Sequence, residues 1–152
     1  PEDDVRVYYT EGLSAAAIVK FLPGIKVPYL DKFVVDPRFR RLGLAELLMN
    51  RLLNDYPEMF WRSREANPIN IFYRQHSDGT FSDDKWRVFW VGKLTVDEVS
   101  PLIKAAVNAP ETLVDFPEGG TPFVHRLSTS KPRVGIIGAR GYTGNELMKL
   151  II

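Results

Sequence analysis

Residues 33–45 (FVVDPRFRRLGLA) constrain the fold more than any other stretch of the sequence. The pattern indicates an apolar strand that ends at Pro37, a basic turn, and a helix that begins at Gly43. The first N–H groups of a helix have no partner within it, and the helix dipole places positive charge at the same end. We therefore expect this turn to bind a diphosphate, or else to be a plain turn with a surface arginine cluster. The arginines that add positive charge here are Arg38, Arg40 and Arg41.

The first 109 residues alternate short apolar strands with two or three helices, which is typical of an α/β (α+β) domain. The helix after Thr95 has the clearest start signal, because Thr95 and Glu98 form a capping box. Its apolar stripe runs to Pro110, which ends it. The strands expected from alternation and turn signals span residues 5–9, 13–22, 28–35, 59–64 and 85–92, and the other helices span residues 43–54 and 67–73.

The composition changes after residue 109. Residues 110–132 combine recurring prolines with Gly119-Gly120 and a Ser/Thr cluster, so we interpret them as a linker. Residues 133–152 then carry an apolar strand, a glycine loop and the start of a helix, which is a truncated Rossmann-type unit. The other strands of a parallel sheet are missing, so we expect residues beyond 110 to be poorly packed unless they dock on the first domain. The loop glycines that would approach a dinucleotide pyrophosphate are Gly138, Gly141 and Gly144.

A second concentration of polar side chains lies in residues 60–81. Arg62 and Arg64 fall on one face of an expected strand, because side chains alternate along it. Two arginines on one face can bind carboxylates bidentately, and Asn67 adds a third polar contact. Such a clamp fits a dicarboxylate amino acid such as glutamate or its N-acetyl form. The alternative is that both arginines form surface salt bridges with nearby acids.

Charge and composition exclude several other classes of function. Twenty basic and nineteen acidic residues give a formal net charge of +1, which favours neither nucleic-acid nor anionic-membrane partners. The chain has no cysteine, and its two histidines, His76 and His125, have no partner at metal-ligand spacing. No apolar run reaches the length of a membrane span. We expect no metal, and we interpret the chain, which starts at Pro1, as an excerpt of a longer protein.

The motifs of both polar regions resemble those of known enzymes. Residues 35–45 are similar to the acyl-CoA loop of GNAT-fold N-acetyltransferases. Residues 30–35, 60–64 and 67–70 (LDKFVV, FWRSR and NPIN) resemble the acetyltransferase domain of vertebrate-type N-acetylglutamate synthases and fungal acetylglutamate kinases. Residues 134–152 resemble the start of N-acetyl-γ-glutamyl-phosphate reductase. Together they resemble the junction of the fungal kinase–reductase precursor of arginine biosynthesis.

This resemblance implies a GNAT-like mixed, mostly antiparallel sheet flanked by helices, with acetyl-CoA as cofactor and N-acetylglutamate or glutamate as ligand. It implies that Tyr73 is the general acid for the departing thiolate, although an aromatic ring packed in the core is the alternative. Asp31 is a candidate base, and an ordered water is the alternative. NADP is implied only for a complete reductase domain. The residues implied to line acetyl-CoA are Phe33 and Val35 through their backbone, Arg40, Arg41, Gly43 and Ala45, and those for the acylamino acid are Arg62, Arg64 and Asn67.

The resemblance also implies a biological setting. The domain would regulate an attached amino-acid kinase domain and its inhibition by arginine, and an active N-acetylglutamate synthase is the alternative. The parent enzyme would carry kinase and reductase activities, form a homo-oligomer and lie in the mitochondrial matrix. Residues 125–130 resemble a mitochondrial processing site, so we expect cleavage in the linker, with an uncleaved connector as the alternative.

Overall fold

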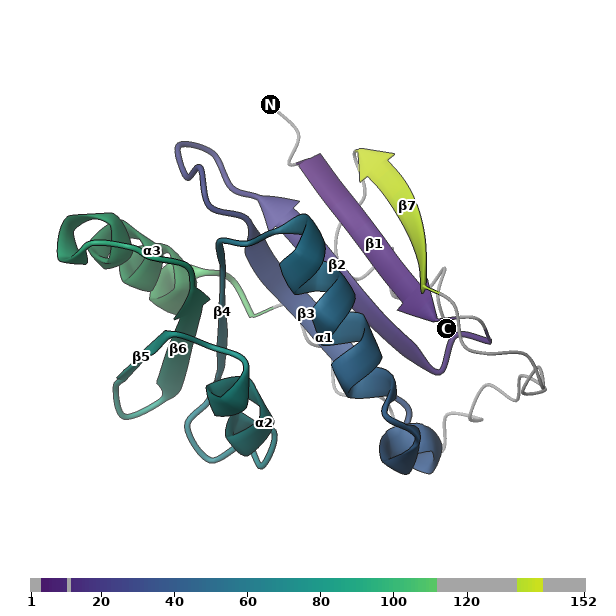
Figure 1. Ribbon diagram of the computed structural model, residues 1–152. Coiled ribbons are helices and arrows are strands. Elements are labelled where there is room, and N and C mark those ends of the chain that lie inside the picture. The colour runs from purple at the N-terminus through teal and green to yellow at the C-terminus, as the bar shows by residue number, and fades with distance from the viewer. Residues whose placement is uncertain (1–3, 11, 112–133, 141–152) are drawn as a thin grey trace.

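The computed structural model describes residues 4–10, 12–111 and 134–140, and its centre is a seven-stranded sheet (Figure 1). The strand order is β5-β6-β4-β3-β2-β1-β7, and all neighbours pair antiparallel except β3 and β4, which are parallel. The expected mixed, mostly antiparallel sheet is therefore confirmed. The strands are β1 (Asp4–Thr10), β2 (Ala15–Phe21), β3 (Tyr29–Val35), β4 (Met59–Arg64), β5 (Gly79–Ser82), β6 (Trp86–Val91) and β7 (Val134–Arg140). The helices are the 3-10 helix η1 (Pro37–Leu42) and the α-helices α1 (Leu44–Asp55), α2 (Asn70–Gln75) and α3 (Val96–Asn108).

Most elements lie where the sequence predicts them, and the differences have local causes. Thr95 caps α3 as the sequence predicts, because its Oγ1 accepts a hydrogen bond from the Glu98 N–H in the first turn. Helix α2 begins at Asn70 rather than at Pro68, because the Asn67 side chain accepts the Ile69 N–H within a preceding turn. The sequence does not predict β5, whose four residues are mostly exposed and show no apolar alternation.

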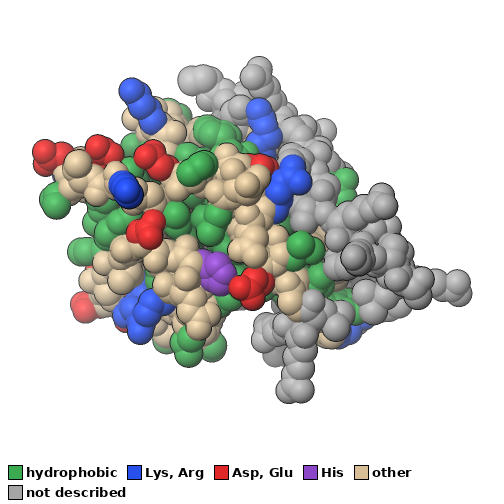
Figure 2. Space-filling model, viewed as in Figure 1, with side chains coloured by type: hydrophobic (Ala, Val, Ile, Leu, Met, Phe, Trp, Pro, Cys, Tyr) green, Lys and Arg blue, Asp and Glu red, His purple; other side chains and the backbone are tan. Residues whose placement is uncertain are grey.

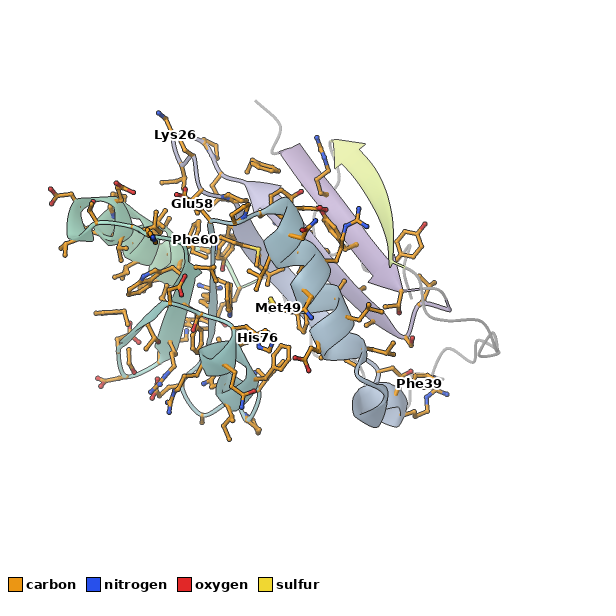
Figure 3. All side chains as sticks on the ribbon, viewed as in Figure 1. Lys26, Phe39, Met49, Glu58, Phe60 and His76 are labelled. Atoms are coloured by element: carbon orange, nitrogen blue, oxygen red, sulfur yellow. The ribbon has the colours of Figure 1, made fainter. Side chains whose placement is uncertain are left out.

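The helices cover opposite faces of the sheet. Adjacent residues of a strand point to opposite faces, and on β4 Trp61 packs with the core beneath α1 while Phe60 packs with the core beneath α3. Leu48 and Met49 of α1 are fully buried in the first of these cores, and Leu102 of α3 belongs to the second. Figure 3 shows Met49 directed toward the sheet and Phe60 on the side of α3. We refer to these faces as the α1 face and the α3 face.

The two parallel strands separate soon after they meet. β3 and β4 pair only at Tyr29 with Phe60 and at Leu30 with Trp61, although both strands continue beyond this point. The pairing of β2 with β3 shifts register between Ile18 and Val19, which leaves Asp31 as an extra residue in β3. Such a bulge bends the strand and re-aims its side chains. The sheet therefore has a gap between the second halves of β3 and β4.

The C-terminal strand docks on the first domain, as the sequence prediction allowed. β7 pairs along the whole of β1, with Gly138 opposite Arg6. Gly138 thus lies within an edge strand at the far side of the sheet from β5. The other two loop glycines, Gly141 and Gly144, lie outside the described residues, as do the linker from residue 112 to 133 and its expected processing site. Among the described helices, none combines the length and the apolar character that crossing a bilayer requires.

Candidate functional site

A cavity of about 410 Å³ occupies the gap between β3 and β4. Side-chain alternation directs Arg62 and Arg64 to the α3 face and Ser63 to the α1 face, where Tyr73 also packs. The cavity is therefore reached by side chains of both faces, so that two ligands approaching from opposite sides of the sheet could meet in it. Its lining residues are Tyr29, Asp31, Lys32, Phe33, Val34, Arg62, Ser63, Arg64, Asn67, Tyr73, Trp86 and Glu111.

Six of the residues predicted from the sequence come together in this cavity, and others lie elsewhere. The predicted phosphate turn, with Gly43 and Ala45, belongs to the junction of η1 and α1. The side chains of Arg40 and Arg41 are not among those described, and the glycine of β7 lies at the opposite end of the sheet. The predicted residues that line the cavity are Asp31, Phe33, Arg62, Arg64, Asn67 and Tyr73.

Arg62 is held by the C-terminal end of α3. Its Nη1 donates hydrogen bonds to the carbonyl oxygens of Ala106 at 2.9 Å and Ala109 at 2.7 Å, and its Nη2 donates to that of Pro110 at 3.1 Å. Its guanidinium also lies 3.8 Å from the centroid of the Trp86 ring. These carbonyls carry the negative end of the helix dipole, so a cation is favoured there. Arg62 therefore both stabilises the end of α3 and presents positive charge to the cavity.

Arg64 already binds a carboxylate. Its Nη2 lies 3.0 Å from Oε2 of Glu111, and Lys85 forms an ion pair with the other oxygen of the same carboxylate. The hydrogen bond from Lys85, followed by the charge of Arg64, holds the pKa of Glu111 below its usual value. The Arg64 guanidinium also lies 4.6 Å from the centroid of the Trp86 ring, on which Arg62 stacks. The alternative of a surface ion pair is thus found for Arg64, and it demonstrates that this position accommodates a carboxylate.

Tyr73 packs its ring in the core and is also one of the residues that line the cavity. The residue is only 6% exposed, and its ring contacts Trp61 and Phe89 edge-on, each at a centroid distance of 5.5 Å. Burial raises the pKa of the Tyr73 phenol above its usual value. The phenol therefore stays protonated near neutral pH. The core interpretation is confirmed by the ring contacts, and it is compatible with the general-acid interpretation, because Tyr73 also lines the cavity.

A buried charge cluster lies beside the gap. Oδ2 of Asp31 is 3.2 Å from Nζ of Lys20 and 3.4 Å from Nζ of Lys32, in ion pairs that do not meet hydrogen-bond geometry. Lys32 is 8% exposed, and desolvation lowers its pKa although Asp31 opposes this shift. Asp31 thus holds an ammonium group at the cavity wall. Sequence reasoning missed Lys32, because strand alternation would separate it from Asp31 and only the bulge brings the two charges together.

The start of α1 has the geometry expected of an anion site. Gly43 adopts φ +71° and ψ +15°, a left-handed conformation that favours glycine, and no side chain caps the helix. The first intrahelical hydrogen bond runs from the Leu47 N–H to the Gly43 carbonyl at 3.0 Å. The N–H groups between these two residues therefore have no partner within the helix. Asp36 caps η1 and forms a 2.6 Å ion pair with Arg38, so the charge of Arg38 is already partnered.

An aromatic chain connects the gap to α2. Phe33 stacks on Phe72 at a centroid distance of 6.0 Å, and Phe72 contacts the His76 ring at 4.3 Å. Nδ1 of His76 lies 2.9 Å from the Phe72 carbonyl oxygen, and Nε2 lies 3.8 Å from Oε1 of Glu46 at the start of α1. Figure 3 shows His76 between α2 and α1, and in Figure 2 both signs of charge are interspersed over the same face. No group of three potential metal ligands occurs among the described residues.

Sequence comparisons find relatives over the first domain. The chain is 40% identical over 107 residues to "N-acetylglutamate synthase, mitochondrial" of Homo sapiens, covering 70% of this chain and 20% of that protein. It is 35% identical over 111 residues to "Acetylglutamate kinase" of Xylella fastidiosa, covering 73% and 26%. It is 29% identical over 169 residues to "Protein ARG5,6, mitochondrial" of Candida albicans, covering 95% and 20%. The chain therefore spans about a fifth to a quarter of the length of these relatives.

Among solved structures, the chain is similar to a ribosomal-protein-S18-alanine N-acetyltransferase from Escherichia coli, with a TM-score of 0.40 and 16% identity, covering 59% of this chain and 73% of that one. It is also similar to a nourseothricin acetyltransferase, with a TM-score of 0.40 and 14% identity, covering 53% and 59%. The family model described as "NAT, N-acetyltransferase, of N-acetylglutamate synthase" matches residues 2–109. The chain therefore belongs to the N-acetyltransferase (NAT) domain family of N-acetylglutamate synthase.

Proposed function

We propose that this domain binds acetyl-CoA and N-acetylglutamate or glutamate in the gap between β3 and β4, and that it regulates the activity and arginine inhibition of an attached acetylglutamate kinase domain. The observation that carries the ligand proposal is the cavity that joins the cationic α3 face to Tyr73 on the α1 face. The alignment with the Candida relative covers 95% of this chain and only 20% of that protein. This supports a setting in a longer arginine-biosynthesis protein. The mitochondrial names of the human and Candida relatives support a location in the matrix.

The residues present fit acetyl-CoA in two respects. The N–H groups at the start of α1 have no partner within the helix and no side-chain cap, and such groups after a left-handed glycine suit a pyrophosphate. The second half of β3, from Phe33 to Val35, has no paired strand on the side of β4, so its backbone can bind the amide groups of the pantetheine arm. When bound, acetyl-CoA supplies the acetyl group at the gap. The chain's own residues would orient the thioester and exclude water from it.

The α3 face fits a molecule with two carboxylates. Arg62, Arg64 and Lys32 line one cavity, and Trp86 lies beneath both arginines. Planar guanidinium groups stacked on an aromatic ring are pre-oriented for bidentate binding of carboxylates. Arg64 already binds the carboxylate of Glu111, and Arg62 supplies a second guanidinium on the same face, so a dicarboxylate such as glutamate or its N-acetyl form suits this pair better than a neutral or singly charged amino acid. Asn67 supplies a further polar contact at the cavity wall.

A second candidate function, catalysis of acetyl transfer to glutamate, is favoured by Tyr73. Its protonated phenol lines the same cavity as the cationic residues, where it could donate a proton to the sulfur as the thiolate departs. Positioning of the amine against the thioester would supply most of the rate. The proton of the ammonium group would leave through an ordered water or through Asp31. Asp31 is already ion-paired with two lysines, which favours the water.

One set of measurements tests the ligand proposal. Isothermal titration calorimetry of the chain with acetyl-CoA and with N-acetylglutamate should show one saturable site for each ligand, with dissociation constants below the millimolar range. Glutarate, which lacks the acetamido group, and N-acetylglutamine, which lacks the side-chain carboxylate, should bind more weakly than N-acetylglutamate. Absence of heat for both main ligands at millimolar concentration would refute the proposal. A parallel assay of acetyl transfer to glutamate separates an active domain from a regulatory one.

The regulatory part needs the full-length protein. Deleting residues 1–109 from a kinase that contains this domain should change the concentration of arginine that half-inhibits the kinase. Kinase activity measured without arginine serves as the control for intact folding of the remaining protein. An unchanged arginine response in an active kinase would contradict a regulatory role.

Glu111 should compete with the ligand for Arg64. The Glu111 carboxylate forms ion pairs with Arg64 and with Lys85. A dicarboxylate ligand that binds Arg64 must therefore displace the Glu111 carboxylate. We expect Glu111→Gln to tighten N-acetylglutamate binding by roughly two- to fivefold, because an exposed ion pair of this kind contributes less than about 1 kcal/mol. The measurement is calorimetry, with Glu98→Gln on the far end of α3 as a control for the loss of one negative charge. Equal affinities for wild type and Glu111→Gln would show that Glu111 does not occupy the ligand position.

A further inference from the structure

Ser63 is a buried polar residue without an evident structural task. It is 7% exposed, and its Oγ atom has no hydrogen-bond partner among the described residues. A buried hydroxyl group without a partner costs stability, so a protein usually pairs such a group or replaces it. Thr10 and Ser14, two other buried hydroxyl residues, follow this rule and bond to each other at 3.0 Å. Ser63 is one of the residues that line the cavity between β3 and β4, which is where a partner can enter.

The position of Ser63 on β4 indicates which part of a ligand could form a hydrogen bond with its hydroxyl group. Trp61 is the last residue of β4 paired with β3, and its ring contacts Tyr73 at 5.5 Å. Ser63 comes two residues later, on the same face of the strand, so it lies past the last pair and at the gap. The groups needed for the carboxylates lie on the opposite face, on Arg62 and Arg64. The hydroxyl group therefore faces the side of the gap that Tyr73 shares.

Trp61 offers a useful contrast on the same face. Its Nε1 also has no hydrogen-bond partner among the described residues. Its ring, however, is enclosed between Tyr73 and Phe89, and it is absent from the cavity wall. Ser63, unlike Trp61, therefore belongs to the cavity wall, so a ligand in the cavity lies against Ser63 rather than against the indole ring.

We propose that Ser63 donates a hydrogen bond to the carbonyl oxygen of the acetyl group at the gap. This inference rests on the proposed function, because it requires an acyl ligand in the cavity. An acetyl carbonyl is present both in the thioester of acetyl-CoA and in the amide of N-acetylglutamate, and it must lie where the two ligands meet. If transfer occurs, negative charge grows on this oxygen, so the same hydrogen bond becomes stronger in the transition state. Ser63 would then be a specificity residue that distinguishes acetylated from free ligands.

The test compares acetyl-CoA with CoA by calorimetry. Ser63→Ala is expected to weaken acetyl-CoA binding roughly three- to tenfold, the usual effect of losing one hydrogen bond, and to leave CoA binding unchanged. Ser63→Thr keeps the hydroxyl group and should recover most of the preference for acetyl-CoA. Equal losses for acetyl-CoA and CoA, or no loss for either, would overturn the proposal.

Thermal unfolding supplies the structural control. Removing an unpartnered buried hydroxyl group should leave Tm of Ser63→Ala unchanged or raised. Ser14→Ala, which breaks a paired hydroxyl remote from the cavity, should lower Tm without changing the ratio of the two affinities. A reduced Tm for Ser63→Ala with an unchanged affinity ratio would assign the hydroxyl group a purely structural role. If wild-type protein binds neither acetyl-CoA nor CoA, the proposed function fails, whereas binding of both without any effect of Ser63→Ala refutes this inference alone.

Discussion

Tyr73→Phe is expected to lower the rate constant of acetyl transfer about a hundredfold or more, with little change in ligand affinity. A positioned general acid contributes roughly 10²- to 10⁴-fold to a proton-coupled step, and phenylalanine removes only the hydroxyl oxygen. The ring contacts with Trp61 and Phe89 are kept, so the fold should be preserved. Steady-state kinetics with acetyl-CoA and glutamate, together with calorimetry of both ligands, measure the two effects separately.

Tyr56→Phe is the matched control, because Tyr56 packs edge-on against Tyr8 and Phe21 and lies outside the cavity wall. It should leave acetyl transfer unchanged. If Tyr73→Phe retains the full rate, another group protonates the sulfur. If wild-type protein binds acetyl-CoA and glutamate without turnover, the domain is a ligand sensor. Tyr73 then lines the binding site without taking part in catalysis.

Arg62→Ala is expected to lower the free energy of unfolding and to abolish most binding of N-acetylglutamate. The guanidinium donates hydrogen bonds to three carbonyl groups at the end of α3, two of them partly buried and one exposed, and a hydrogen bond from a charged donor contributes about 1.5–3 kcal/mol where it is buried and less where water competes. We expect a net loss of about 2–3 kcal/mol in urea unfolding. Loss of a bidentate carboxylate contact should weaken ligand binding by about tenfold to a hundredfold.

Arg64→Ala separates the two expected effects of Arg62→Ala, which are a loss of stability and a loss of ligand binding. Its only described ion pair is with the exposed Glu111, and such pairs contribute about 0–1 kcal/mol. Arg64→Ala should therefore weaken N-acetylglutamate binding and leave urea unfolding nearly unchanged. Arg62→Lys should not restore either property, because an ammonium group cannot reproduce the planar fork that reaches several carbonyls. Full stability of Arg62→Ala would show that α3 does not depend on this guanidinium.

The order of elements follows from patterns within short segments of the sequence. β4 has the bounds that alternation predicts, and α3 begins directly after its predicted N-cap, Thr95. The turn at Gly43 is also predictable, since glycine is favoured where the backbone becomes left-handed before a helix. These features depend on a few neighbouring residues, so the local sequence is sufficient to determine them. The mostly exposed β5 lacks such a pattern, and the sequence did not reveal it.

The arrangement of the site depends on pairings between distant segments. Arg62 and Arg64 share a face as alternation predicts, but only the packing of α3 against β4 shows that Arg62 binds the carbonyls of Ala106 and Ala109, which lie more than forty residues later. Likewise, sequence patterns indicate neither the bulge at Asp31 nor the buried position of Lys32, because both arise from the register between β2 and β3.

The sequence by itself determined which residue types are available to the proposed site, and in which local elements they lie. The tertiary structure decided that β3 and β4 separate after two residue pairs and that the resulting cavity joins both faces of the sheet. The physical reason is that a local pattern fixes the direction of a side chain relative to its own strand, whereas the spacing between strands is set by the pairing and packing of the whole sheet.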